Sequence, residues 1–221
     1  MFLGIFFMAS ISSPVQDNGL TYNPELEQEI TRELENKLKA KTQEQPVLIL
    51  IGGFQGSGKS SLIARIKEIY DANVISTDSI RQHLFNRGIK VSPEFSQYVI
   101  KIYSNLVKQS LKNNSNILID ANSHSKRIAE MGELLKENGS HYSIVKIFLN
   151  ASETTLRNRV KTRTPMEGCY QGTESDLKAA LASTKVNLED YDLIVDTDEL
   201  SESHVFELVN DFISPYFKPC V

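Results

Sequence analysis

The chain has 221 residues, which is the size of one globular domain and enough to bury a substantial core. Hydrophobic residues make up 40% and charged residues 24%, as in ordinary soluble proteins, and the net charge of −4 gives no general sign of nucleic-acid or membrane binding. The two cysteines, Cys169 and Cys220, indicate neither a disulfide framework nor a zinc site.

Residues 1–21 are predicted to be a leader outside the folded domain, which we expect to span 22–221. Met1–Ala9 is almost wholly apolar, but it is too short to span a bilayer and lacks the positively charged start of a secretory signal. We expect translation to begin at Met8 and the leader to be disordered or wrongly assigned. The alternative is a short signal peptide.

A first helix is expected over residues 24–41. Asn23 is a favoured N-cap, Pro24 suits the first helical position, and Glu25 suits the first turn. Four apolar residues then recur every four positions, at Leu26, Ile30, Leu34 and Leu38. We interpret this helix as a packing element.

The stretch 47–61 carries the most specific motif of the chain. Val47–Ile51 reads as a strand buried on both faces, and Gly53-x-x-x-x-Gly58-Lys59-Ser60 has the spacing of a phosphate-binding loop. Glycines let backbone N–H groups approach an anion, Lys59 supplies a charge for the β- and γ-phosphates, and Ser60 offers a hydroxyl to Mg²⁺. We therefore expect ATP to bind here, at Gly53, Phe54, Gln55, Gly56, Ser57, Gly58, Lys59, Ser60 and Ser61.

Strands and helices alternate through the rest of the chain. Further strands are expected at 73–77, 116–120, 142–149 and 191–195, and helices at 59–70, 78–85, 92–112, 125–138, 152–162, 173–183 and 203–212. This order predicts an α/β fold with a parallel sheet covered on both faces. Ligands bind at the carboxyl ends of such strands, which draws attention to Asp78, Asp120 and the pair Asp196-Thr197.

Asp78 directly follows the second predicted strand, and Arg81 lies one helical turn later. A carboxylate at that place can accept a proton from an attacking hydroxyl, and the arginine can hold a substrate anion. The alternative is that Asp78 is an N-cap and Arg81 a surface residue. The position at the sheet edge favours the functional interpretation.

Asp120 ends the apolar strand Ile117–Asp120, the usual place for an acidic residue directed at Mg²⁺. We expect Ser60 and Asp120 to hold that ion. The residues that follow, Ala121 and Asn122, include no water-activating glutamate, and the chain contains no Asn-Lys-x-Asp motif for guanine. Both absences favour a kinase over an ATPase or a GTPase.

Three arginines lie on or just after the helix predicted at 152–162, namely Arg157, Arg159 and Arg163. Arg159 and Arg163 share a face, and the polar loop over 165–172 can close as a lid. Arginines in such a lid neutralise a transferring phosphoryl group. A solvated basic helix face is an equally good interpretation.

Several motifs in this order resemble the zeta-toxin and polynucleotide-kinase branch of small P-loop kinases, a group of AAA-type ATP-binding phosphotransferases. The matching pieces cover about residues 46–213: Gly53–Ser60, Ile75–Arg81, Ile117–Asn122 with Lys126-Arg127, Leu156–Arg163 and Ile194–Thr197. The predicted helix at 24–41 lies outside this shared core.

The resemblance implies a P-loop three-layer sandwich with strand order 2-3-1-4-5 and a lid that carries arginines. It also implies that Asp78 is the general base, that Arg81 contacts substrate or phosphate, and that Arg159 and Arg163 are lid arginines. Together with Lys59 these would be the catalytic residues. Acceptors in this group are unrelated to one another, so the resemblance names none.

The sequence thus predicts a cytoplasmic enzyme that uses ATP and Mg²⁺ to phosphorylate a hydroxyl of a small molecule or a polynucleotide end. Two alternatives remain open: a toxin-type kinase of a nucleotide sugar such as UDP-N-acetylglucosamine, and a non-catalytic ATP-binding switch. We expect no membrane partner, and the net charge does not indicate a nucleic acid.

Overall fold

The computed structural model describes residues 22–90, 93–120, 125–138, 141–164 and 171–217. The expected leader and most of the expected lid loop lie outside these residues. The described part contains a five-stranded sheet of β1 (Val47–Gly52), β2 (Asn73–Ser76), β3 (Ile117–Asp120), β4 (Ser143–Asn150) and β5 (Leu193–Asp196). Its helices are α1 (Pro24–Glu35), α2 (Lys59–Ile69), α3 (Thr77–Asn86), α4 (Pro93–Lys112), α5 (Ser125–Asn138), α6 (Glu153–Thr162), α7 (Glu174–Ser183) and α8 (Glu202–Ile213).

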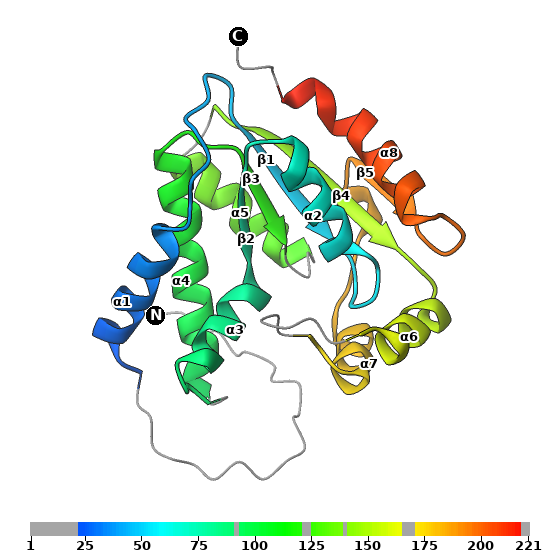
Figure 1. Cartoon of the computed structure of the whole chain (residues 1–221), viewed down its shortest axis with the longest axis horizontal. Helices are drawn as coiled ribbons and strands as arrows, with labels where there is room; N and C mark the ends of the chain where they lie inside the picture. The colour runs from blue at the N-terminus through cyan, green and yellow to red at the C-terminus, as the bar shows by residue number, and fades with distance from the viewer. Residues whose placement is uncertain (1–21, 91–92, 121–124, 139–140, 165–170, 218–221) are drawn as a thin grey trace.

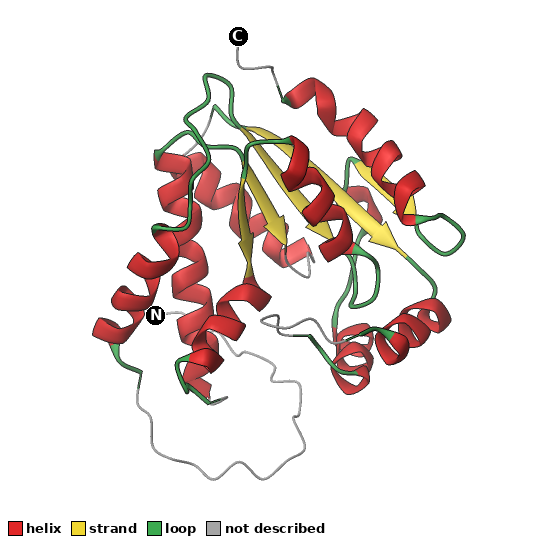
Figure 2. Ribbon diagram, viewed as in Figure 1, coloured by secondary structure: helices red, strands yellow, loops and turns green. Residues whose placement is uncertain are grey.

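All strand pairs are parallel, and the strand order is β2-β3-β1-β4-β5, as predicted. The carboxyl ends of the strands therefore lie at one edge of the sheet, where α3, α6 and α7 are also found (Figure 2). The register places Ile51 and Ser76 on either side of Asp120. This pairing brings the ends of three strands to the same place.

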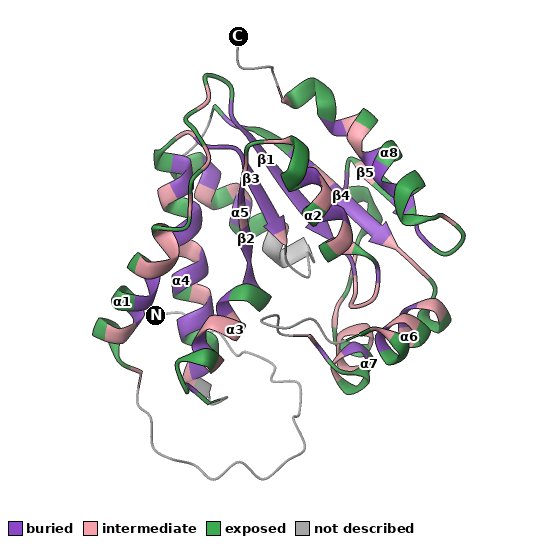
Figure 3. Ribbon diagram, viewed as in Figure 1, coloured by how far each residue is buried: buried purple, intermediate pink, exposed green. Residues whose placement is uncertain are grey.

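Two hydrophobic clusters lie on opposite faces of the sheet, because side chains alternate along a strand. Leu48 and Leu50 pack with residues of α1, α3, α4 and α5, whereas Ile49 and Ile51 pack with α2 and α8. The sheet is the buried middle layer (Figure 3). The three-layer α/β fold predicted from the alternation of strands and helices is confirmed.

The first helix is shorter than predicted. It ends at Glu35, with Asn36 as C-cap, and not at Lys41. The backbone N–H of Ala40 donates to Asn73 Oδ1 at 3.0 Å, and that of Lys41 donates to Asp71 Oδ2 at 3.0 Å. The apolar periodicity continues past the helix because Leu38 still packs against the core in a non-helical segment.

Helix starts follow the local capping chemistry. The Thr173 hydroxyl accepts from the N–H of Asp176, whose carboxylate accepts from the N–H of Thr173, and the two bonds form a capping box at the start of α7. Ser152 is the N-cap of α6, and its hydroxyl accepts from the N–H of Thr155. Among the described residues, no helix combines the length and the apolar character that a bilayer crossing requires.

Candidate active site

The phosphate loop, Gly53–Ser60, joins β1 to α2 at the carboxyl edge of the sheet. Gly53 has φ +145°, and a Cβ there would lie 2.4 Å from Ser57 Oγ and 2.7 Å from the Leu149 carbonyl oxygen. Gly58 is the N-cap of α2 in the left-handed region and provides no side-chain cap. The first N–H groups of α2 therefore receive no hydrogen bond from an N-cap side chain, and such a helix start is a common place for an anion to bind.

Lys59 is the first residue of α2, and its ammonium group folds back over the loop. Nζ donates to the carbonyl oxygens of Gly53 at 2.7 Å and Phe54 at 3.1 Å. Burial lowers the pKa of Lys59, an effect opposed by the nearby carboxylates of Asp120 and Asp78. These two hydrogen bonds hold the ammonium group of Lys59 against the phosphate loop, where the lysine is expected to contact the phosphates of ATP.

Asp120 ends β3 beside Ser76, whose hydroxyl donates to Asp120 Oδ2 at 3.3 Å. Burial raises the pKa of Asp120, Lys59 opposes this, and Asp78 adds to it. The three charged groups therefore share one environment at the ends of β2 and β3. Sequence reasoning missed Ser76; a serine that ends a strand and precedes a helix is the signal that marks it.

The residues proposed for Mg²⁺ provide oxygen donors that suit this ion. Ser60 is exposed in the first turn of α2, and Asp120 is half-buried. The described residues contain no group of three or more metal-binding side chains.

Asp78 and Arg81 lie on one side of the first turns of α3. Arg81 Nη1 is 2.5 Å from Asp78 Oδ1 and donates to Thr77 Oγ1 at 3.1 Å. Ser76 is the N-cap of α3, and its hydroxyl accepts from the N–H of Ser79. The alternative that Asp78 serves as the N-cap is therefore wrong, and its half-exposed carboxylate is left for other contacts.

The three arginines on or just after α6 have different surroundings. Arg159 donates to Thr197 Oγ1 at 3.0 Å and to the Gly56 carbonyl oxygen at 3.3 Å, which links the phosphate loop to the end of β5. Arg163 donates to the Gly172 carbonyl oxygen and, by its charge, lowers the pKa of Lys59. Arg157 pairs instead with Glu153 and Glu174 at the surface.

Phe54, inside the phosphate loop, joins that loop to α6 and α7. Its ring packs against a small core of Leu156, Val160 and Leu177, and lies edge-on to Phe148 with centroids 6.4 Å apart. From the sequence, Phe54 is expected only to take part in ATP binding. The sequence signal for this packing role is an aromatic residue at one of the four positions that the motif Gly53-x-x-x-x-Gly58 leaves unspecified.

Two loop side chains have buried polar atoms that lack a hydrogen-bond partner in the part of the chain that the structure describes. They are Ser57 Oγ and Gln55 Oε1. Ser57 itself is only 1% exposed. A buried hydroxyl without a hydrogen-bond partner lowers the stability of the folded protein. Its presence in this loop is consistent with a loop that binds a ligand.

Comparison with known proteins gives one family match. The model of a family described as "AAA domain" matches residues 48–186. The match begins inside β1 and ends after α7, so it covers the phosphate loop, α3 and the arginine-bearing α6, but not α1 or α8. No curated protein matches the chain.

Three solved structures, two of them kinases, share the fold. A sugar kinase from Janibacter sp. HTCC2649 is 14% identical, with a TM-score of 0.56 over 76% of this chain and 95% of that chain. A gluconokinase from Sinorhizobium meliloti 1021 is 17% identical, with a TM-score of 0.55 over 79% and 95%. The PezAT toxin–antitoxin system of Streptococcus pneumoniae gives 23% identity and a TM-score of 0.52 over 63% and 62%.

Proposed function

Because the chain belongs to the AAA domain family, we propose that it is an ATP-dependent phosphotransferase that moves the γ-phosphoryl group of ATP to an alcohol hydroxyl. One observation carries the proposal. A phosphate loop with its half-buried lysine lies beside two carboxylates, Asp78 and Asp120, at the carboxyl edge of a parallel sheet. That arrangement provides an anion site and a base at the same place.

In the proposed reaction an acceptor oxygen forms a bond to the γ-phosphorus while the bond from that phosphorus to the β–γ bridging oxygen breaks, and ADP leaves. Asp78 takes the hydroxyl proton. Lys59 and the N–H groups of the phosphate loop stabilise charge on the phosphates. Bound Mg²⁺, held by Ser60 and Asp120, would neutralise charge on the β- and γ-phosphates.

Arg81 and Arg163 are proposed to neutralise the remaining negative charge. Arg81 now pairs with Asp78, so its guanidinium lies where an acceptor anion or the phosphoryl group can compete for it. Arg163 reaches the same region from the end of α6. Arg159 is proposed to act on the phosphate loop through the Gly56 carbonyl, and its place in a lid stays a proposal.

The finer branch, zeta-toxin-like or polynucleotide-kinase-like, is also a proposal. It is supported by the motifs around Asp78 and Asp120, and the PezAT structure has the same fold. A toxin-type kinase of a nucleotide sugar is the second candidate. Its test is expression in a bacterial host: growth arrest by the wild type that disappears in Lys59→Ala favours it, and normal growth opposes it.

The main experiment is phosphorylation of a metabolite and oligonucleotide pool with labelled ATP and the purified full chain. Transfer to a hydroxyl compound by the wild type but not by Lys59→Ala supports the proposal. ATP binding with no acceptor in any pool favours the non-catalytic switch instead. We propose that the reaction takes place in the cytoplasm, where ATP is available.

A further inference from the structure

Helix α1 lies outside the residues matched by the family model, yet it is joined to α3, the helix that carries Asp78 and Arg81. We propose that Glu29 and Glu33 of α1, with His83 and Arg87 at the far end of α3, are positioning residues for the acceptor side of the site. These four side chains are called the brace below. The inference rests on the proposed function only for the roles of Asp78 and Arg81.

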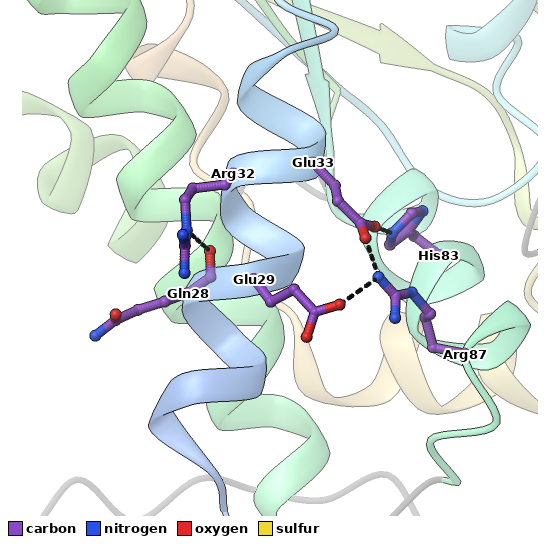
Figure 4. A network of polar contacts seen from close by, with 6 residues as sticks. All are labelled: Gln28, Glu29, Arg32, Glu33, His83 and Arg87. Carbon is purple, nitrogen blue, oxygen red and sulfur yellow. Dashed lines mark hydrogen bonds and ion pairs between the residues drawn. The ribbon is translucent and has the colours of Figure 1, made fainter.

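The brace uses both oxygens of one carboxylate. Glu33 Oε2 is 3.0 Å from His83 Nε2, and Glu33 Oε1 contacts Arg87, whose Nη2 also lies 3.0 Å from Glu29 Oε1. Figure 4 shows the side chains of the two helices pointing toward one another. The His83 hydrogen bond and then the charge of Arg87 lower the pKa of Glu33, which favours its charged form.

Buried side chains hold α1 against α4, so the two glutamates of the brace project from a helix that is itself fixed in place. Ile30 is fully buried among residues of α3 and α4. Glu27 is also buried, and its carboxylate accepts hydrogen bonds from Tyr22, Thr31 and Asn105 at 3.0 to 3.1 Å. Exposed ion pairs add little to stability, so these buried contacts, and not the brace, hold α1 against α4.

The length of α3 explains how the brace, at one end of the helix, can change the position of Arg81 near the other end. The helix begins directly after β2, so Ser76 is its fixed end. At 1.5 Å per residue, Arg87 lies about 16 Å along the axis from Ser76, Arg81 about 7 Å and Asp78 about 3 Å. A tilt about Ser76 therefore moves Arg81 more than Asp78, and a shift of about 1 Å in a positioned group is enough to slow a reaction strongly.

The test compares Glu29→Gln/Glu33→Gln with Glu25→Gln/Glu35→Gln in the full chain. The second pair makes the same charge change on the same helix at glutamates outside the brace. Amide hydrogen exchange reports on α3, with α8 as an internal reference. We expect at least roughly fivefold faster exchange in α3 for the brace variant only, with α8 unchanged in both variants.

Steady-state kinetics with Mg·ATP and the acceptor from the pool screen supply the second measurement. We expect the brace variant to raise the acceptor KM at least about fivefold with the KM for ATP unchanged, because Arg81 moves more than the phosphate loop.

Unchanged α3 exchange overturns the inference. So does faster exchange throughout the protein with a large fall in Tm, since the network would then be a general stabiliser. If no variant transfers phosphate, the proposed function fails, and the exchange result still decides whether the brace holds α3.

Discussion

Among single residues, Lys59 contributes a charge that the rest of the phosphate loop lacks. Lys59→Ala is expected to weaken ATP binding or abolish transfer without unfolding the domain, because α2 is held by its apolar face and alanine favours a helix. Calorimetric ATP titration and a turnover assay measure the two effects. Lys67→Ala, an exposed lysine on the same helix, is the control and should behave like the wild type.

Asp78 is expected to act as the base and not as a metal ligand. Asp78→Asn should leave ATP affinity nearly intact and lower transfer at least about a hundredfold, the low end for a positioned general base. The helix start should survive, because Ser76 is the N-cap. ATP titration and turnover of the same preparation separate the outcomes. Wild-type turnover would mean that Asp78 is only a surface residue, and a parallel loss of Mg·ATP affinity would make it a metal ligand.

At the scale of elements, the phosphate loop and the α6–α7 pair share a small core through Phe54. Phe54→Ala should loosen α6 and α7 and cost about 1–3 kcal/mol, less than the usual loss for a fully buried phenylalanine because this ring is half-buried. Hydrogen exchange localises the change, and denaturant unfolding measures its size. Phe54→Leu keeps most of the apolar volume and should recover most of the loss. Equal exchange in α6 and α7 for wild type and Phe54→Ala would contradict this coupling.

At the scale of the whole molecule, two buried tyrosines predict a loss of stability at high pH. Burial raises the pKa of Tyr142 above its ordinary range and that of Tyr191 to about 12. An unfolded tyrosine ionises near pH 10, so the unfolded state loses its protons first and stability falls as the pH rises from about 10 toward 12. Chemical unfolding between pH 8 and 11 measures the slope.

Tyr142→Phe is the control for the alkaline transition. The Tyr142 hydroxyl donates to the carbonyl oxygens of Ser110 at 3.1 Å and Ser115 at 2.9 Å, so its removal should lower stability at pH 8. The variant should then lose less further stability above pH 10, because one titrating group is gone. A slope as steep as that of the wild type would remove Tyr142 from the explanation.

Local patterns in the sequence determined the helices, the strands and the phosphate-loop motif. Apolar strand runs, capping residues and the glycine spacing of 53–60 are short-range features, and each depends on neighbours a few residues away. The strand order came from the resemblance, not from the periodicity, and the structure confirms it. The helix end at Glu35 was missed because apolar periodicity does not distinguish a helix from a segment held by long-range hydrogen bonds.

Only the tertiary structure decided which partners the charged side chains contact. Arg159 donates to the Gly56 carbonyl oxygen and to Thr197, and Glu33 of α1 pairs with His83 and Arg87 at the end of α3. These pairs are separated by many residues along the chain, and a long polar side chain has several partners within reach of its rotamers. Sequence determines which charges are available at the sheet edge, whereas packing determines which of them meet, because burial and distance set the energy of each contact.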